Sequence, residues 1–223
     1  MMQMLRDFTA PYSAAEAWLY DAIVSPASTA LVEAFASAHI AALPAGARVL
    51  DVGCGGGQNA IAIAERQQSL EVTGLDLNDG QVARARRRAD KRGVDVTFIN
   101  GSALDLPFDD GEFDLVLSIA SIKHWPDQAK GLSECTRVLK PGGQLFVAEA
   151  DRGCLLDDAR DFVGRTRVPK PLRGVALAGF RTWVAGQGLD LDDARALLSA
   201  LPLASWTAER VANTPAVLLS GTR

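Results

Sequence analysis

From Arg48 onward, short apolar segments alternate with segments whose apolar residues recur at helical spacing. This alternation predicts a parallel sheet with helices on both faces, because each connection between parallel strands must cross over the sheet. The segments predicted as strands are residues 48–53, 71–77, 96–101, 113–121 and 144–150. The segments predicted as helices are residues 58–67, 82–93 and 128–139. The chain is therefore expected to be an α/β protein with a doubly wound, mostly parallel sheet.

Two more apolar segments follow, at residues 204–211 and 216–222. Only Ala212–Pro215 separates them, which is too short for a crossover helix, so these two strands should be antiparallel neighbours. The complete sheet is thus expected to have seven strands, including a C-terminal antiparallel strand.

Composition and charge exclude several classes of protein. The net charge of −4 and the pI near 5.2 disfavour a nucleic-acid partner, since such binding depends on Lys and Arg neutralising phosphates. There is no apolar run of roughly 18 residues, and Arg6 and Asp7 interrupt the apolar stretch that a secretory signal needs. Cys54, Cys135 and Cys154 form no C-x-x-C pair and are expected to be reduced. We expect a cytoplasmic protein that binds neither membranes nor nucleic acid.

The first predicted strand runs into the sequence LDVGCGGGQNA, in which Gly53, Gly55 and Gly57 precede a helix. Glycines at this place permit a tight turn and let the backbone approach a ligand closely. The helix N-terminus offers unpaired N–H groups and a partial positive charge to an anion. The loop is a candidate ligand site, although tight glycine turns also occur at strand ends without a ligand.

An acidic residue, Asp76, ends the second predicted strand, roughly twenty residues after Gly53. A carboxylate there lies at the tip of the neighbouring strand and can accept hydrogen bonds from ribose hydroxyls. The dinucleotide fingerprint G-x-G-x-x-G is incomplete because Gln58 stands in place of its third glycine, and no Gly-Lys-Ser/Thr follows to make a P-loop. We therefore expect a ligand that contains adenosine but is held by neither of these motifs.

Four features combine in this chain: the pattern D-x-G-x-G-x-G from Asp51 to Gly57, Asp76 at a strand end, and the segments SALDLPFDDGEFDLVLS and ECTRVLKPGGQLFVAEA. Together they resemble the class I S-adenosylmethionine-dependent methyltransferases, and within them the small-molecule branch that includes the ubiquinone and menaquinone biosynthesis enzymes. The resemblance covers residues 44–151. It implies a Rossmann-like methyltransferase fold, S-adenosylmethionine as cofactor and S-adenosylhomocysteine as product. It also implies methyl transfer to a small organic acceptor by direct in-line displacement.

We expect a single methyltransferase domain over residues 1–223, in four parts. These are an N-terminal helical cap (1–43), a cofactor-binding half (44–151), a helical acceptor-side insertion (152–203) and a terminal strand pair (204–223). The oligomeric state is open, because apolar helical faces after Asp151 would allow a homodimer.

In this family's arrangement, the loop at Gly53, Cys54 and Gly55 would hold the methionine end of the cofactor, with Asp51 supporting the loop. Asp76 would bind the ribose. The other expected contacts are Leu77 against the adenine, Ser102 and Ala103 at its other edge, and Ser118 and Ile119 along the passage to the methyl group. Many members carry aspartate at the position of Ser102, and serine can accept the same adenine hydrogen bond with a shorter reach.

His124 follows the fourth predicted strand, in the stretch SIASIKHWPD. Ligands bind at the carboxyl ends of strands in such sheets, so His124 is a candidate base or acceptor-positioning group. The alternative is a structural role, in which His124 packs the loop and helps to cap the next helix near Asp127. A base is needed only if the acceptor must lose a proton, because the sulfonium is already a good leaving group.

The same stretch lacks the motifs of other methyltransferase subclasses. After Leu117 there is no Asn/Asp-Pro-Pro-aromatic motif of amino-group methylases, no Pro-Cys pair of cytosine C5 enzymes and no carboxylate for magnesium, so we expect no metal. Two other functions stay open. A nicotinamide-dependent oxidoreductase shares the glycine loop and the acidic strand end, although Gln58 and the terminal antiparallel pair disfavour it. An inactive S-adenosylmethionine-binding protein would share every motif.

Overall fold

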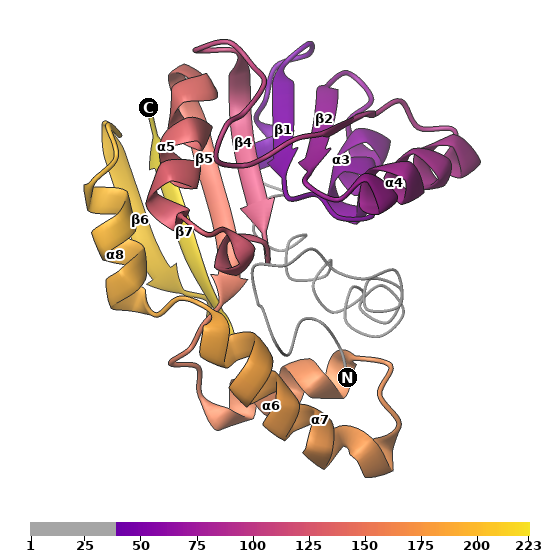
Figure 1. Cartoon of the computed structure of the whole chain (residues 1–223), viewed down its shortest axis with the longest axis vertical. Coiled ribbons are helices and arrows are strands. Elements are labelled where there is room, and N and C mark those ends of the chain that lie inside the picture. Colours follow the sequence, from indigo (N-terminus) through magenta and orange to yellow (C-terminus); the bar gives the residue numbers. More distant parts are fainter. Residues whose placement is uncertain (1–38) are drawn as a thin grey trace.

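The computed structural model describes residues 39–223, which form one mixed sheet of seven strands (Figure 1). The strands are β1 (Arg48–Val52), β2 (Glu71–Asp76), β3 (Thr97–Asn100), β4 (Phe113–Ile119), β5 (Leu139–Ala150), β6 (Ser205–Arg210) and β7 (Ala216–Thr222). Their order in the sheet is β3-β2-β1-β4-β5-β7-β6. Strands β1 to β5 pair in parallel, whereas β7 runs antiparallel between β5 and β6. The predicted seven-stranded sheet with a C-terminal antiparallel strand is confirmed.

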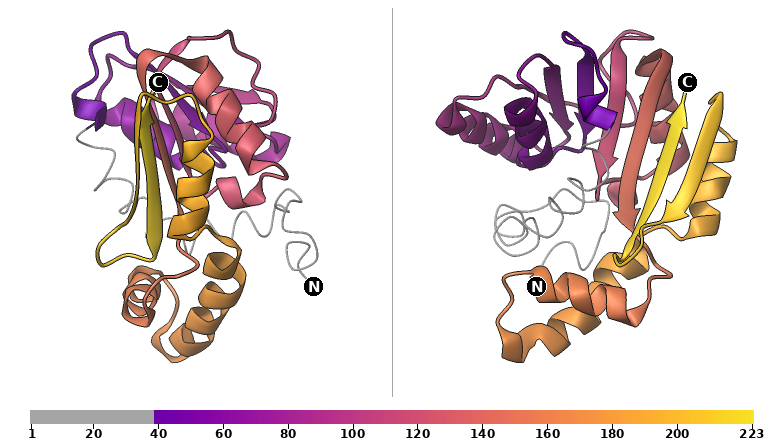
Figure 2. Two further views of the ribbon diagram at one scale, coloured as in Figure 1. Left: turned by 90° about the vertical axis from the view of Figure 1, so that its left-hand side faces the viewer. Right: turned by 180° about the vertical axis from the view of Figure 1, so that it is seen from behind.

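Helices cover both faces of this sheet (Figure 2). They are α3 (Gln58–Arg66), α4 (Asp79–Arg92), α5 (Gln128–Val138), α6 (Leu156–Arg165), α7 (Arg173–Gly179) and α8 (Leu191–Ser199), with the short turns η2 (Ile122–His124), η3 (Lys170–Leu172), η4 (Phe180–Val184) and η5 (Ala185–Gln187). Along β4, Leu115 and Leu117 join the core under α3 and α4, whereas Val116 joins the core under α5 and α8. Because both faces are covered, β4 is apolar throughout its centre, as expected of a central parallel strand.

Side chains start several of these helices. Oδ1 of Asn78 accepts hydrogen bonds from Gly80 N and Gln81 N at the start of α4, at 2.8 and 3.2 Å. Oδ1 of Asp127 accepts one from Lys130 N at the start of α5, at 2.9 Å. Helix α3 differs, because no side chain caps it and it begins directly after the glycine loop. Its first N–H groups are therefore left for other acceptors.

Two strands differ from the predicted bounds by more than one residue at an end. Strand β5 begins at Leu139, directly after α5. Residues 140–143, whose proline and glycines are typical of a turn, are therefore a bulge inside the strand. Leu139 pairs with Phe113, four residues bulge outward, and regular pairing resumes between Gln144 and Leu115. Strand β4 ends at Ile119, two residues early, because Ala120 adopts a left-handed conformation.

The segment between β5 and β6 begins with α6 and α7, which lie beyond the carboxyl end of β5 (Figure 1). It has a small core of its own, in which the rings of Phe162 and Phe180 pack with their centroids 5.0 Å apart. The π-helical turn η4 places Phe180 inside this core and leaves Trp183 55% exposed. Residues 156–187 are thus a helical unit attached to the sheet, and α8 then returns to the sheet.

The predicted helical cap over residues 1–43 lies almost entirely outside the described residues. Within residues 39–223, no helix combines the length and the hydropathy that crossing a membrane requires. Cys54, Cys135 and Cys154 are free thiols, and the first two are buried.

Candidate functional site

The glycine loop, residues 53–57, connects β1 to α3. Gly53, Gly55 and Gly57 have φ angles of 75°, 53° and 78°, in the left-handed region that favours glycine. Space also excludes a larger residue, since a Cβ on Gly53 would lie 1.9 Å from Oγ of Ser121. The loop therefore presents backbone atoms where side chains would otherwise stand.

Asp76 joins the end of β2 to this loop. Its Oδ2 accepts a hydrogen bond from Gly55 N at 2.8 Å, and its Oδ1 accepts one from Asn78 N at 2.9 Å. Gly53 N donates to Leu75 O at 2.8 Å, which ties the loop to β2 a second time. Burial raises the pKa of Asp76, and the Asn78 and Gly55 amides oppose that rise. Each carboxylate oxygen keeps a further lone pair for a ligand hydroxyl.

Asp51 lies near the carboxyl end of β1, two residues before the glycine loop begins, and 1% of its surface is exposed. Burial, together with the charge of Asp76, raises the pKa of Asp51 to about 7, and the backbone amide of Ala60 opposes only part of this rise. Neither carboxylate oxygen has a hydrogen bond of ordinary geometry to any described residue. A buried carboxyl group without a partner is costly, so Asp51 suits a site that a polar or cationic group completes.

Three of the described residues, including Asp51, have buried side-chain oxygen atoms without a hydrogen-bond partner. Among the described residues, the buried side-chain atoms that lack a hydrogen-bond partner are Oδ1 and Oδ2 of Asp51, Oε1 of Gln81 and Oγ of Ser118. Gln81 lies in the first turn of α4, with its Nε2 atom 3.9 Å from where a Cβ on Gly55 would stand. Because buried polar atoms are nearly always paired, unpaired atoms that gather at one edge of a sheet indicate a polar ligand there.

Leu77 follows Asp76, and 58% of its surface is exposed. Its backbone is fixed, because Nδ2 of Asn100 donates to Leu77 O at 2.9 Å and to Asp76 O at 3.1 Å. Ser102 and Ala103 follow β3 on the adjacent strand, and Oγ of Ser102 accepts from Leu104 N at 3.1 Å. The loops after β2 and β3 thus offer an apolar side chain and a hydroxyl from neighbouring strands.

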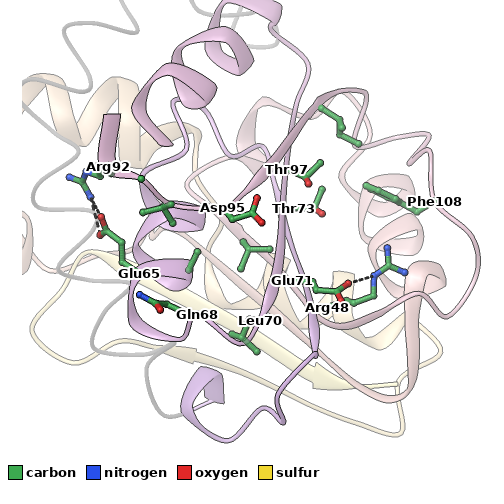
Figure 3. Close-up of a pocket in the computed structure, with 15 residues that line it drawn as sticks. Arg48, Glu65, Gln68, Leu70, Glu71, Thr73, Arg92, Asp95, Thr97 and Phe108 are labelled. Carbon is green, nitrogen blue, oxygen red and sulfur yellow. Dashed lines mark hydrogen bonds and ion pairs between the residues drawn. The ribbon is translucent and has the colours of Figure 1, made fainter. Parts of the chain in front are cut away.

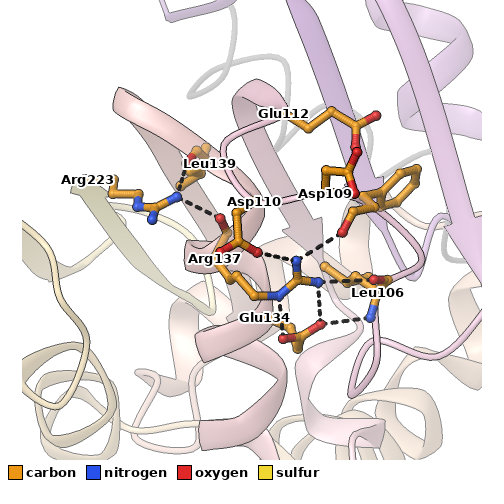
Figure 4. A network of polar contacts seen from close by, with 9 residues as sticks. Leu106, Asp109, Asp110, Glu112, Glu134, Arg137, Leu139 and Arg223 are labelled. Carbon is orange, nitrogen blue, oxygen red and sulfur yellow. Dashed lines mark hydrogen bonds and ion pairs between the residues drawn. The ribbon is translucent and has the colours of Figure 1, made fainter.

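The loop after β3 is anchored by Arg137 of α5 (Figure 4). Its guanidinium donates to Leu106 O at 3.1 Å and to Phe108 O at 2.9 Å. Glu134 accepts from Nε of Arg137 at 2.8 Å and from Leu106 N at 2.9 Å. The hydrogen bond from Arg137 lowers the pKa of Glu134. Neither Arg137 nor Glu134 was among the predicted site residues, because their contacts with this loop are distant in sequence.

Arginines of α4 also reach the site. The run of arginines in this helix is typical of a solvated basic face. In the structure, however, Arg88 donates to Gly56 O in the glycine loop, and Nη2 of Arg86 donates to Phe98 O of β3 at 2.5 Å. Val82 and Ala85 of the same helix are buried. These two arginines therefore bind backbone carbonyls of the neighbouring strand and loop, which the charge pattern of the sequence did not indicate.

Ser118 and Ile119 end β4, next to β1 in the sheet. Ser118 is fully buried and Ile119 is 9% exposed. The next residue, Ala120, has a φ of 54°, which residues other than glycine rarely adopt. The chain thus turns sharply at the end of the strand, and the turn continues into η2.

His124 is the last residue of η2 and is partly buried. Its backbone N–H donates to Ser121 O at 2.9 Å. The cap of α5 is made by Asp127, so His124 is not the capping residue. His124 lies beyond the carboxyl end of β4, at the same edge of the sheet as the glycine loop.

Lys123 and Glu149 form a buried ion pair beside this turn. Nζ of Lys123 lies 2.7 Å from Oε1 of Glu149, and their side chains are 4% and 0% exposed. Neither was among the predicted site residues. The available signal was a lysine and a glutamate in otherwise apolar stretches, since charged residues are seldom buried unless they are paired.

All the predicted site residues come together at one edge. They lie at or just beyond the carboxyl ends of four adjacent strands, namely Asp51, Gly53, Cys54 and Gly55 at β1, Asp76 and Leu77 at β2, Ser102 and Ala103 at β3, and Ser118, Ile119 and His124 at β4. Open α/β sheets bind ligands at this edge. Within residues 39–223, no group of three His, Cys, Asp or Glu side chains is placed to hold a metal ion.

A hollow of about 830 Å³ lies at the opposite edge (Figure 3). It is bordered by the first residues of three strands, Arg48, Glu71 and Thr97. Most of the charged side chains that border it form ion pairs with one another. Nε of Arg48 lies 3.7 Å from Oε2 of Glu71, and Nη1 of Arg92 lies 3.1 Å from Oε2 of Glu65. This hollow is separate from the glycine loop and shares none of the predicted site residues.

Known proteins resemble this chain over the part that carries the site. Residues 50–147 match the family model described as a methyltransferase domain. The chain is 43% identical over 102 residues to demethylmenaquinone methyltransferase of Thermus thermophilus, covering 46% of each chain. It is 41% identical over 109 residues to 27-O-demethylrifamycin SV methyltransferase of Amycolatopsis mediterranei, covering 48% of this chain and 40% of the relative. The chain thus spans less than half the length of these two relatives.

A longer match extends beyond the cofactor-binding part. Over 164 residues the chain is 34% identical to ubiquinone biosynthesis O-methyltransferase of Xanthomonas axonopodis pv. citri, covering 70% of this chain and 67% of the relative.

Solved structures share the fold. A protein of Methanococcus maripaludis matches with a TM-score of 0.72 at 18% identity, covering 93% of this chain and 90% of that one. An S-adenosylmethionine-dependent methyltransferase of Aquifex aeolicus matches with a TM-score of 0.68 at 16% identity, covering 95% and 99%. At such low identity these matches establish the architecture alone.

Proposed function

Because this chain belongs to the class I S-adenosylmethionine-dependent methyltransferases, we propose that it transfers a methyl group from S-adenosylmethionine to a small organic acceptor. The observation that carries this proposal is the gathering of unpaired buried polar atoms around the glycine loop, with Asp76 hydrogen-bonded to Gly55 at its centre. A cofactor with an ammonium, a carboxylate, a ribose and an adenine ring supplies the partners that these groups lack.

The methionine end of the cofactor would lie on Gly53, Cys54 and Gly55, where two glycines without side chains let a ligand approach the backbone. The uncapped N-terminus of α3 suits the carboxylate. The buried Asp51 suits the ammonium, because a cation nearby favours the ionised carboxyl group that burial otherwise disfavours.

The adenosine end would lie across β2 and β3. Asp76 has lone pairs left for the ribose hydroxyls, and the exposed Leu77 offers an apolar surface to the adenine ring. Ser102 and Ala103 border the other edge of the ring, where Oγ of Ser102 can act as donor or acceptor. The anchoring of this loop by Arg137 keeps that edge in place.

When bound, the cofactor supplies a methyl group on a sulfonium, which is a good leaving group. The contribution of the chain is mainly orientation, which can supply roughly 7 to 11 kcal/mol of the acceleration when reacting atoms are held in line. Ser118 and Ile119 would border the passage to the methyl group, and His124 would accept a proton only from an acceptor that must lose one.

The acceptor would be a small molecule that reaches the site past residues 152–203. This segment exposes several large apolar side chains, namely Leu155, Leu156, Leu172, Val175 and Trp183, which suit an acceptor with apolar parts. The relatives reported above are named for quinone and rifamycin methylation, which agrees with this chemistry.

We infer a single domain over residues 1–223. We also infer that the protein is cytoplasmic, since buried free cysteines are usual in reducing compartments.

A ligand panel tests the cofactor. S-adenosylmethionine and S-adenosylhomocysteine should each raise the melting temperature, since a ligand at 100 times its Kd adds about 2.7 kcal/mol of stability. NAD should not, because the dinucleotide fingerprint is incomplete. A response to NAD alone would overturn the methyltransferase proposal in favour of an oxidoreductase.

An acceptor screen tests the activity. Turnover of a library of small phenols, quinols, carboxylic acids and amines, read as S-adenosylhomocysteine released, should identify at least one acceptor class. Tight cofactor binding without turnover across the library would instead favour an inactive cofactor-binding protein.

A further inference from the structure

The chain adopts an unfavourable backbone conformation directly after β4. Ala120 has a φ of 54°, in the left-handed region where Cβ crowds the following carbonyl oxygen. It follows Ile119, which lies at the proposed passage to the methyl group. Such a conformation persists only where surrounding contacts hold it, and it is common at functional sites.

Both backbone polar groups of Ala120 are held. Its N–H donates to Ala148 O of β5 at 2.8 Å. Its carbonyl oxygen accepts from Nζ of Lys123 at 2.9 Å. The second contact closes the turn, because Lys123 reaches back across it to a carbonyl three residues earlier.

Glu149 completes the arrangement from β5. Its Oε1 accepts from Nζ of Lys123 and from Ala150 N, each at 2.7 Å, and its Oε2 accepts from Lys123 N at 3.2 Å. The carboxylate thus binds both the side chain and the backbone of Lys123. The pair is almost fully buried, so water does not compete with these contacts.

The same turn packs on the glycine loop. Oγ of Ser121 occupies the space that a Cβ on Gly53 would need, at 1.9 Å from it. Nε1 of Trp125 donates to this Oγ at 3.1 Å. A displacement of the turn would therefore press on the loop or withdraw from it.

We propose that Lys123 and Glu149 are positioning residues, which hold the left-handed turn Ala120–Trp125 against the glycine loop and so set the position of the methyl-transfer site. The inference rests on the proposed function for the meaning of that site. A role in overall stability alone does not require charge, since apolar side chains of similar volume often replace buried ion pairs without loss.

The experiment compares Lys123→Met and Glu149→Gln with a matched control, Lys140→Met. Lys140 of β5 pairs with Asp114 of β4 at 2.7 Å, but this pair is partly exposed and lies toward the opposite edge of the sheet. S-adenosylhomocysteine affinity is measured by titration calorimetry. Amide hydrogen exchange of residues 118–125 is measured without ligand.

Lys123→Met should weaken S-adenosylhomocysteine binding about tenfold, within the range of a single disrupted buried contact. It should also speed hydrogen exchange in residues 118–125, and Glu149→Gln should do both to a smaller degree. Lys140→Met should do neither. Lys123→Met and Glu149→Gln variants that match Lys140→Met in both measurements would overturn the proposal.

A second substitution distinguishes an effect on the turn from a general loss of stability. Glycine adopts the left-handed conformation without strain, so adding Ala120→Gly to Lys123→Met should restore most of the lost affinity, while Ala120→Gly alone should change it little. If the double variant binds no better than Lys123→Met, the pair does not act through this turn and the proposal is wrong. If Lys123→Met does not fold, Glu149→Gln with and without Ala120→Gly carries the same comparison.

The two proposals fail in different ways. A wild-type protein that does not bind S-adenosylhomocysteine would contradict the proposed function. The hydrogen-exchange comparison of residues 118–125 needs no ligand and would still support or overturn the positioning role.

Discussion

Asp51 shows how one buried side chain can favour ligand binding over the stability of the free protein. Its carboxyl group is buried beside the glycine loop, near the charge of Asp76, and its pKa is raised to about 7. Above that pH the folded chain holds a buried negative charge that no hydrogen bond of ordinary geometry from a described residue stabilises, and the Ala60 amide offsets only part of the cost. Such an arrangement destabilises the free protein and is relieved by a bound cation.

Asp51→Asn should therefore stabilise the free protein, and more so at higher pH. The unfolded chain ionises this carboxyl near 3.8 and the folded chain near 7, so wild-type stability falls as the pH rises through this interval. The advantage of the variant should grow by roughly 2 kcal/mol between pH 5.5 and pH 8. Urea unfolding at the two pH values measures it, with the exposed Asp95→Asn as control. An advantage independent of pH would contradict the raised pKa.

His124 is the residue whose role depends most on the acceptor. If it is the base, His124→Ala should lower kcat by about 10²-fold or more while leaving S-adenosylmethionine affinity unchanged. The matched control is His39→Ala, because the other histidine lies against Phe146 with the ring centroids 5.7 Å apart. Wild-type turnover in His124→Ala, on an acceptor that must lose a proton, would leave His124 with a structural role.

Helix α5 acts as a support for a loop that it follows in sequence. Arg137 and Glu134 hold the backbone of the loop after β3, and that loop carries Ser102 and Ala103. Arg223 extends the network, since it donates to the carbonyl oxygens of Arg137 and Leu139 (Figure 4). The edge of the proposed adenine site therefore depends on contacts from the far end of the chain.

Arg137→Met should weaken S-adenosylhomocysteine binding and lower stability by about 1 to 3 kcal/mol, because it leaves Phe108 O without the Arg137 donor and Leu106 O with the Phe108 N–H alone. Calorimetry and urea unfolding measure the two effects. Arg195→Met is the control, since Arg195 pairs with Asp192 at 3.4 Å on the exposed face of α8 and holds no loop. Equal effects of both substitutions on binding would rule out the support of the loop by α5.

In the molecule as a whole, the sheet and the helical unit at residues 156–187 have separate cores. The buried residues of this unit form a small cluster around Phe180, apart from the two clusters on the faces of the sheet. A small core gives low local stability, so this unit should open more readily than β4 and β5. Mobility there would let an acceptor enter.

Phe180→Ala should speed hydrogen exchange within residues 156–187 and leave β4 and β5 protected. Leu132→Ala, in the core under α5, should instead lower the stability of the whole sheet by about 2 to 5 kcal/mol. Hydrogen exchange with mass spectrometry and urea unfolding distinguish these outcomes. A loss of global stability in Phe180→Ala as large as in Leu132→Ala would mean that the two cores unfold together.

The backbone architecture could be predicted from local patterns. Apolar alternation placed each strand to within a few residues, and the short connection Ala212–Pro215 predicted the antiparallel pairing of β6 and β7. The predicted strand bounds were wrong where tertiary contacts compete with the local preference of the chain. Glycine and proline at 140–143 predicted a turn, but pairing with β4 on both sides makes this stretch a bulge within β5.

The sequence by itself determined the sheet, the glycine loop and the placement of Asp76 beside it, because strand periodicity, left-handed glycines and residue spacing are local properties of the chain. Only the tertiary structure decided which polar groups are paired. Lys123 with Glu149, Arg137 with the loop after β3, and the unpaired Asp51 depend on side chains that the fold brings together from distant positions. The physical reason is that burial sets the strength of a charge or hydrogen bond, and burial belongs to the packed molecule.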